Sequence, residues 1–255
     1  MKNIVISLTA ATDRRAHIKK EFNKHNVNFE FFDALMPESA KTYANELNIN
    51  INSSQMSSGE LACALSHIAV WQRIIDENIA YATIFEDDVY LGDDAKYLLN
   101  NTDWIKTDWN IIKIESFDNK VFLSAAYTKL PNVKRQIASL KGKHLGGAGY
   151  ILSLQGAKLL MDYLLDSELI PIDELIFDKF IQSKSESVYQ MTPALCIQEK
   201  ILKVSHLSLP SSLDVNRDHR MSNNKKTFKT KLTRETRRLK HQFKKSIFAK
   251  DIPFK

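Results

Sequence analysis

Short apolar runs alternate along the chain with segments that have helical periodicity. Between two of these runs, for example, Leu61, Leu65 and Ile68 recur at intervals of four and three residues. Buried strands that alternate with amphipathic helices are typical of a mainly parallel sheet covered by helices on both faces. The pattern therefore predicts an α/β fold. The runs predicted as strands span residues 4–8, 28–32, 81–85, 110–114, 150–154 and 189–197.

Capping residues mark where two of the predicted helices begin. Thr12 is the predicted N-cap of a helix that places Ile18 and Phe22 on one face. Ser57 and Glu60 have the spacing of a capping box, in which each side chain satisfies a backbone N–H at the helix start. We therefore expect one helix to follow each of these caps.

Three acids, Glu86, Asp87 and Asp88, directly follow the apolar run 81–85. Adjacent anions repel one another unless a cation or a hydrogen-bond donor meets them, and residues two apart on an extended chain point to the same side. Mg²⁺ and Mn²⁺ prefer oxygen ligands, and Mg²⁺ typically takes one or two carboxylates with water and substrate phosphates. The acids are therefore candidate ligands for a cation that binds a nucleoside diphosphate. An acidic turn that closes the strand is the alternative.

Composition indicates a soluble globular protein. The chain has 255 residues, of which 44% are hydrophobic and 26% are charged, enough for one large domain or one domain with a tail. Cys63 and Cys196 are too few for a disulfide framework, which indicates a reducing cytoplasm, and Cys63 is expected in the core. The apolar start of the chain is interrupted by Ser7 and Thr9, so we interpret it as a first core strand rather than a signal peptide.

Basic residues are concentrated near the C-terminus. Residues 217–255 hold 14 of the 36 Lys and Arg and three of the 30 acids, a formal charge of +11 against −5 for the rest. We therefore divide the chain into a body, 1–216, and a basic amphipathic tail, 217–255. Such a helix typically binds an anionic membrane surface, and a partner-binding helix is the alternative. The apolar stripe of the predicted helix contains Leu232, Leu239, Phe243 and Ile247.

Six short motifs occur in order along residues 1 to 205. They are Ile6-Ser7-Leu8 with Asp13-Arg14-Arg15, then Phe31-Phe32-Asp33-Ala34, Gly59-Glu60-Leu61-Ala62-Cys63-Ala64-Leu65-Ser66-His67, Phe85-Glu86-Asp87-Asp88-Val89, Gly147-Ala148-Gly149-Tyr150-Ile151-Leu152-Ser153 and Pro171-Ile172-Asp173. Each is short, but their order and spacing together resemble glycosyltransferase family 25, which contains bacterial lipooligosaccharide galactosyl- and glucosyltransferases. The basic tail lies outside this resemblance.

The resemblance implies a GT-A type, Rossmann-like fold, a UDP-hexose donor, a divalent cation and inversion at the anomeric carbon. It implies that Glu86 and Asp88 are the metal ligands and that Asp87 lies in the same donor-binding motif. The cation, Mn²⁺ or Mg²⁺, would bridge the two phosphates of the donor and stabilise the departing UDP.

Other residues of the motifs are candidates for binding the nucleotide. Ser7, Arg14 and Arg15 follow the first strand, and the planar fork of arginine makes paired hydrogen bonds with a diphosphate. Asp33, at the end of the second strand, could accept hydrogen bonds from the ribose or from uracil, or be a turn residue.

Two histidines are further candidates. Ser66 and His67 could bind phosphate or sugar hydroxyls, although a lone histidine on a helix is more often structural. His206 could complete the metal site, a role suggested only by its position late in the body.

Asp173 is the candidate catalytic base. An inverting transfer needs a carboxylate that takes the proton of the acceptor hydroxyl as its oxygen attacks the anomeric carbon. Asp173 follows Pro171 where a loop enters a predicted helix, and Glu174 and Asp178 are the competing acids. Upstream, a run of glycines at 146, 147 and 149 is expected to let the backbone approach the sugar or acceptor closely.

We therefore predict an inverting, metal-dependent hexosyltransferase that moves galactose, or next glucose, from a UDP-sugar to a lipooligosaccharide acceptor. The expected location is the cytoplasmic face of the bacterial inner membrane, with the tail on anionic lipid and no nucleic acid as partner. A metal-dependent phosphoesterase or nuclease and a noncatalytic sugar- or partner-binding protein are the alternatives. The nuclease would need more scattered acid and histidine ligands than the sequence offers.

Overall fold

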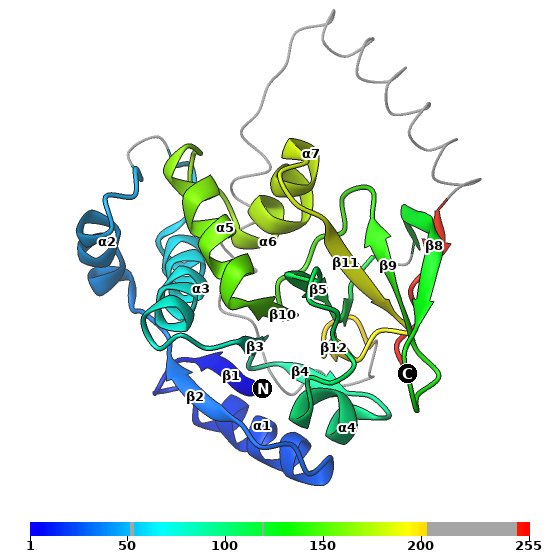
Figure 1. Ribbon diagram of the computed structural model, residues 1–255. Helices are drawn as coiled ribbons and strands as arrows, with labels where there is room; N and C mark the ends of the chain where they lie inside the picture. The colour runs from blue at the N-terminus through cyan, green and yellow to red at the C-terminus, as the bar shows by residue number, and fades with distance from the viewer. Residues whose placement is uncertain (52–53, 119, 203–248) are drawn as a thin grey trace, which may run out of the picture.

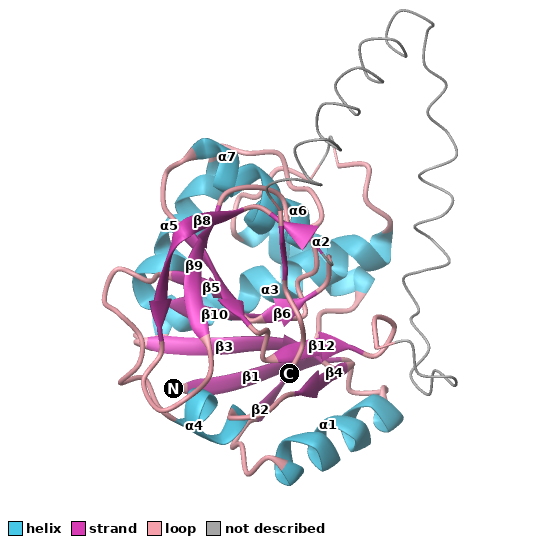
Figure 2. Ribbon diagram, turned by 90° about the vertical axis from the view of Figure 1, so that its right-hand side faces the viewer, coloured by secondary structure: helices cyan, strands magenta, loops and turns pink. Residues whose placement is uncertain are grey.

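A large sheet covered by helices on both faces dominates the structure (Figures 1 and 2). The computed structural model describes residues 1–51, 54–118, 120–202 and 249–255, and the statements below concern these residues. Helices α1 (Thr12–Lys24) and α4 (Ala95–Asn100) cover one face. The other face is covered by α2 (Pro37–Glu46), α3 (Ser58–Asp76), α5 (Leu154–Leu165), α6 (Ile172–Glu174), the π-helical turn η1 (Leu175–Phe180) and α7 (Ile181–Ser183). Among the described residues no helix is both long enough and apolar enough to cross a membrane.

The strands form one large and two small sheets. The large sheet contains, in spatial order, β2 (Glu30–Asp33), β1 (Lys2–Ser7), β3 (Tyr81–Glu86), β10 (Gly149–Ser153), β5 (Ile111–Lys113), β11 (Val188–Thr192), β9 (Gln136–Leu140) and β8 (Leu123–Lys129). A three-stranded sheet contains β4 (Val89–Leu91), β12 (Cys196–Gln198) and β6 (Glu115–Ser116), and a two-stranded ribbon pairs β13 (Lys250–Asp251) with β7 (Lys120–Val121).

Strand direction confirms the predicted α/β class and refines its sheet. Six of the eight described strands of the large sheet run the same way, but β10 and β9 run opposite to both of their neighbours. Because β10 is antiparallel to β3, its first residue pairs with the last part of β3, and Gly149 lies opposite Phe85. The glycine loop that precedes β10 is thereby placed beside the acids that follow Phe85.

Alternating side chains of the sheet build two cores. On β1, Ile4 and Ile6 belong to the core under α3 and α5, whereas Val5 belongs to the core under α1 and α4. On β3, Ile84 and Phe85 divide in the same way. Strands that are buried on both faces read as continuous apolar runs, which is why the sequence pattern located them.

The predicted helix starts have different outcomes. The capping box at the start of α3 is confirmed, since Ser57 Oγ accepts from the Glu60 N–H at 3.2 Å and Glu60 Oε2 accepts from the Ser57 N–H at 2.9 Å. The predicted cap at Thr12 is wrong, because Thr12 is the first helical residue of α1 and Ala11 takes the cap position without a side-chain hydrogen bond.

The end of the chain packs against the body. Ile252 is 3% exposed and joins the core under α3, and its carbonyl accepts from Ser116 Oγ at 2.7 Å. The buried guanidinium of Arg135 donates to the carbonyls of Asp93, Pro193, Ala194 and Lys255. The last seven residues, which the predicted division assigns to the tail, are therefore part of the packed body. The predicted amphipathic stripe and His206 lie outside the described residues.

Replacing Ile252 by alanine should lower the free energy of unfolding by about 2–5 kcal/mol, because it leaves a cavity in the core. Lys250→Ala is the matched control: Lys250 is exposed, and its substitution should change stability by less than about 0.5 kcal/mol. Urea denaturation of the full chain measures both. Equal stability of the two variants would contradict the packing of the chain end.

Candidate active site

A cavity of about 520 Å³ lies at the carboxyl ends of β1 and β3. In open α/β sheets, ligands bind outside the carboxyl ends of the strands, where loops diverge. Its wall combines an apolar part, which includes Leu8, Leu35 and Met36, with polar side chains. The polar residues that line it include six predicted site residues, which are Ser7, Arg14, Ser66, His67, Glu86 and Asp87.

Asp87, in the turn after β3, is hydrogen-bonded to the end of β1 and to α1. Its Oδ2 accepts from Ser7 Oγ at 2.7 Å, and its Oδ1 accepts from the guanidinium of Arg14. Arg14 also lies 3.5 Å from Oδ2 of Asp88. The arginine is thus held at the cavity wall by carboxylates, so an incoming diphosphate would have to share it with Asp87.

Arg15 and Asp33 pair with each other outside the cavity. Arg15 donates to an Asp33 oxygen and to the Ser7 carbonyl at 2.9 Å, and its guanidinium lies 4.7 Å from the centroid of the Phe31 ring. The hydrogen bond from Arg15 lowers the pKa of Asp33. Neither residue lines the cavity, so their predicted contact with the nucleotide stays a prediction.

Glu86 is the last residue of β3, and Asp88 lies in the turn that follows. The carboxylate of Asp88 is buried, and that of Glu86 is half-buried. Burial and the charge of Glu86 raise the pKa of Asp88 to about 7. Burial also works to raise the pKa of Glu86, but His67, Lys200 and Arg14 outweigh it and the pKa lies below its ordinary value. Oδ1 of Asp88 is buried and accepts no hydrogen bond. Glu86 and Asp88 repel each other, and one oxygen of Asp88 is available to a ligand. Both features fit a divalent cation that prefers oxygen ligands.

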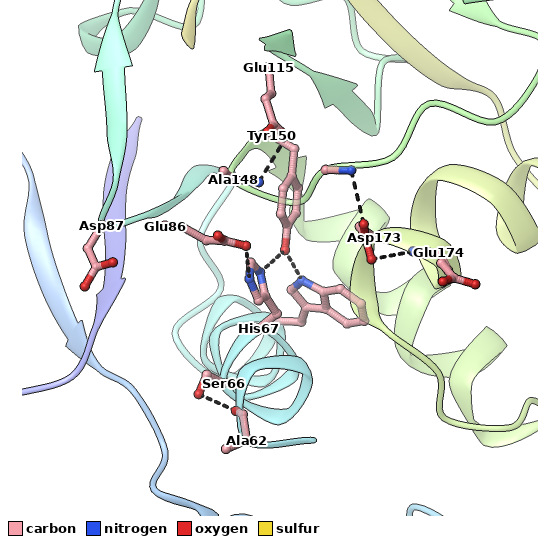
Figure 3. Close-up of polar contacts among 12 residues, drawn as sticks. Ala62, Ser66, His67, Glu86, Asp87, Glu115, Ala148, Tyr150, Asp173 and Glu174 are labelled. Carbon is pink, nitrogen blue, oxygen red and sulfur yellow. Dashed lines mark hydrogen bonds and ion pairs between the residues drawn. The ribbon is translucent and has the colours of Figure 1, made fainter. Parts of the chain in front are cut away.

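Two buried hydrogen bonds lead from Trp71 through Tyr150 to His67, which lies beside Glu86 (Figure 3). The indole N–H of Trp71 donates to the Tyr150 hydroxyl at 2.8 Å, and the same hydroxyl lies 2.9 Å from Nδ1 of His67. Burial raises the pKa of Tyr150, so the phenol keeps its proton and can donate it to Nδ1. His67 then carries its own proton on Nε2, which lies 3.8 Å from Oε1 of Glu86.

Ser66 has its hydrogen bonds in a different place. Its hydroxyl donates to the Ala62 carbonyl at 2.7 Å and accepts from the Leu35 N–H at 2.9 Å, and it points away from His67 in Figure 3. Ser66 therefore ties the loop after β2 to α3. Cys63, expected in the core, is half-buried and lines the cavity one turn before His67.

Asp173 and Glu86 both lie beside Gly147. A Cβ built on Gly147 would be 3.7 Å from Oε1 of Glu86 and 3.7 Å from Cβ of Asp173. The Asp173 carboxylate is oriented by two backbone N–H groups, from Gly146 at 3.2 Å and Glu174 at 3.0 Å. Both acids therefore border the small gap that the missing side chain of Gly147 leaves.

The competing acids have other surroundings. Glu174 points away from this gap in Figure 3. Asp178 lies 3.8 Å from Lys143 and accepts a hydrogen bond from Gln182. Of the three predicted candidates for the base, Asp173 is the one that lies beside Gly147 and the acidic end of β3.

Two buried residues that the sequence reasoning missed hold the glycine loop. Lys113 donates to Glu115 at 2.9 Å and to the Gly146 carbonyl, and Glu115 accepts from the Ala148 N–H at 3.1 Å. Burial raises the pKa of Glu115, and the charge of Lys113 opposes that shift. Lys113 and Glu115 alternate with Ile112 and Ile114 along the chain, so a pattern with a period of two could have placed both charged residues on one face. The pattern could not have shown that they bind the glycine loop.

Glycine is required in this loop for packing. A Cβ on Gly146, whose φ is +89°, would lie 2.7 Å from an oxygen of Glu115, and a Cβ on Gly149 would lie 2.1 Å from Sγ of Cys196. The expected close approach to a sugar is therefore wrong for these two positions, because protein side chains take the space.

Comparison with known proteins gives consistent matches. A family model described as glycosyltransferase family 25 (LPS biosynthesis protein) matches residues 1–176. Lipooligosaccharide biosynthesis protein lex-1 of Haemophilus influenzae is 37% identical over 268 residues, covering 92% of this chain and 88% of that protein. Lacto-N-neotetraose biosynthesis glycosyltransferase LgtB of Neisseria meningitidis serogroup B is 36% identical over 209 residues, covering 78% and 76%. A solved glycosyltransferase involved in glycosylation of the PBCV-1 major capsid has a TM-score of 0.41 at 9% identity, covering 87% of this chain and 99% of that chain.

Asp88→Asn should make the metal-free protein more stable at alkaline pH. The folded-state pKa of Asp88 is raised from 3.8 to about 7, so the folded state binds its proton more tightly and the charged form costs stability. The gain of the variant should grow as the pH rises from about 4 to about 7 and then stay constant, on the order of 1–3 kcal/mol.

Asp87→Asn is the matched control for urea denaturation across this pH range. Its carboxylate accepts from Ser7 and Arg14, so its loss should destabilise the fold by about 1–3 kcal/mol at pH 8. If Asp88→Asn also lost stability, the expected gain would be contradicted, and Arg14 would fully compensate the charge of Asp88.

Proposed function

The chain belongs to glycosyltransferase family 25 and is a glycosyltransferase of lipooligosaccharide or lipopolysaccharide biosynthesis, and from this we propose a specific reaction. It transfers a hexose, galactose first and glucose next, from a UDP-sugar to a glycan acceptor. The transfer depends on a divalent cation and inverts the anomeric carbon. The observation that carries the proposal is the gap at Gly147, which both Glu86 and Asp173 border.

The donor half of the site is supported by the cavity. Its apolar wall around Leu8, Leu35 and Met36 suits a nucleobase, and the guanidinium of Arg14 suits a diphosphate. Glu86 is both a wall residue of this cavity and a neighbour of Gly147. The sugar of a donor bound there would extend from the cavity towards the gap.

Glu86 and Asp88 would hold the cation, since Asp88 offers a buried oxygen without a hydrogen bond. Mn²⁺ or Mg²⁺ bound there supplies Lewis-acid stabilisation of the leaving diphosphate. Arg14, fixed beside both Asp87 and Asp88, adds positive charge at the same place.

The acceptor half is supported by Asp173. In an inverting transfer the attacking oxygen approaches from the side opposite the leaving group, so the base must face the donor site across the reacting carbon. Asp173 borders the same gap as Glu86, which supports this role, and the N–H groups of Gly146 and Glu174 fix its orientation. Its carboxylate takes the proton of the acceptor hydroxyl as the new glycosidic bond forms.

The cellular location is part of the proposal. A glycan acceptor built on lipid lies at a membrane, and the tail carries a formal charge of +11. Anionic lipid attracts basic segments by about 1 kcal/mol for each Lys or Arg near the surface. We place the protein peripherally on the cytoplasmic face of the inner membrane.

A donor screen tests the reaction. Full-length protein with Mn²⁺ is incubated with UDP-, GDP- and CMP-sugars and a lipooligosaccharide acceptor, and nucleotide release is measured with and without chelator. We expect chelator-sensitive release of UDP from one hexose donor, reduced at least about a hundredfold in Asp88→Ala. Chelator-resistant release would contradict the metal dependence.

The matched pair Asp173→Asn and Glu174→Gln tests the base in the same assay. The first should lower kcat about 10²- to 10⁴-fold with little change in the KM for donor. The second should retain the parent rate, because Glu174 points away from the gap. NMR analysis of the product's anomeric configuration tests inversion directly.

Membrane binding is best tested by substitution, since truncation would also remove the packed chain end. Replacing Arg237, Arg238, Lys244 and Lys245 by Gln should weaken partition to anionic vesicles by roughly 1 kcal/mol for each residue. Four Lys→Gln changes on exposed sites of the body, at Lys19, Lys20, Lys41 and Lys96, are the control with the same charge change. Equal loss in both sets, measured by vesicle sedimentation, would contradict a role specific to the tail.

A further inference from the structure

Three side chains of different chemistry meet at the wall of the donor cavity. Cys63 and His67 lie one helical turn apart on α3, and Glu86 ends β3. One ligand atom of each, Sγ, a ring nitrogen and a carboxylate oxygen, lies within 4.8 Å of the other two. All three line the same cavity.

We propose that Cys63, His67 and Glu86 form a binding site for a transition-metal ion of the zinc class, distinct from the oxygen-ligand site of Mn²⁺ or Mg²⁺. Thiolate, imidazole and carboxylate are the ligands of Zn²⁺, whereas Mg²⁺ and Mn²⁺ favour oxygen. Residues four apart on a helix present both ligands on one face. The ligand atoms of Cys63, His67 and Glu86 therefore favour a different metal from the one that the carboxylates of Glu86 and Asp88 would favour.

An unsatisfied nitrogen points into this site. His67 is fully buried, and its Nε2 has no hydrogen-bond partner, since Oε1 of Glu86 is 3.8 Å away. Bond lengths of about 2.0–2.3 Å in a tetrahedral zinc site place neighbouring ligand atoms roughly 3.3–3.7 Å apart. The nitrogen and the carboxylate oxygen are already close to that spacing, and rotation of the Cys63 side chain would complete it.

The hydrogen-bond partner of His67, the Tyr150 hydroxyl, is also suited to a metal site. A bound ion takes the Nε2 lone pair, so the ring proton moves to Nδ1 and is donated to the Tyr150 oxygen 2.9 Å away, while the phenol O–H turns its own proton away from the ring. Histidine ligands usually donate their second N–H to an oxygen in this way, which fixes the ring. Binding releases the thiol proton of Cys63 as well, so three protein ligands and one position open to the cavity hold the ion.

The site shares Glu86 with the proposed donor cation. An ion held by Cys63 and His67 would draw the Glu86 carboxylate away from Asp88. We therefore expect Zn²⁺ to inhibit the transfer, and this consequence, unlike the site itself, rests on the proposed function.

Cobalt absorption tests the site without any use of enzyme activity. Reduced, metal-stripped full-length protein is titrated with Co²⁺, whose bond to a thiolate gives a charge-transfer band in the near ultraviolet. We expect one equivalent to produce the band, Zn²⁺ to displace it, and Cys63→Ser to abolish it. Cys196→Ala, which removes the buried cysteine beside Gly149, should keep it.

Zinc affinity, measured by competition with a chelating dye, should fall at least about tenfold in Cys63→Ser and in Cys63→Ala. Circular dichroism and thermal unfolding verify that the variants fold, and Mn²⁺ affinity by electron paramagnetic resonance should match the parent. No thiolate band, or a band that survives in both Cys63 variants, would overturn the proposal. A band lost with Cys63 in a protein without transferase activity would uphold this site and refute the proposed reaction instead.

Discussion

A buried ion pair holds the loop on which the candidate active site depends. Lys113 and Glu115 are both fully buried, and each also binds the backbone of the glycine loop, at Gly146 and at Ala148. Removing one partner of such a pair would leave an uncompensated charge in the interior, which is strongly destabilising. The same bonds hold the loop that contains Gly147, and Glu86 and Asp173 both border the gap at that residue.

Antiparallel pairing of β10 with β3 makes this arrangement possible. In a wholly parallel sheet, the loop before β10 would enter at the opposite edge from the acids that follow β3. Here the reversed strand begins where β3 ends, and the Glu86 N–H donates to the Ala148 carbonyl at 3.1 Å. One reversed strand therefore brings a segment 60 residues away in the sequence to the carboxyl edge of the parallel strands.

Two adjacent acids of the site differ in how far their hydrogen bonds are satisfied. Asp87 is satisfied by Ser7 and Arg14, whereas Asp88 keeps a buried oxygen without a partner. We expect the first acid to stabilise the fold, whereas the raised pKa of the second makes its charged form unfavourable in the folded state. Functional sites commonly carry such a cost, since a group that is already satisfied has little affinity left for a ligand.

Sequence alone was enough to predict the α/β class, the capping box of α3, the acids at the end of β3 and, from the order of six motifs, the family. These features are local, because periodicity and spacing report which face of an element is buried. The folded structure was needed to show that Trp71 and Tyr150 orient His67, and that Lys113 and Glu115 hold the glycine loop. It also placed the last seven residues in the body and Cys63 at the cavity. Those contacts join segments far apart in the chain, and the periodicity of one segment carries no information about which distant segment packs against it.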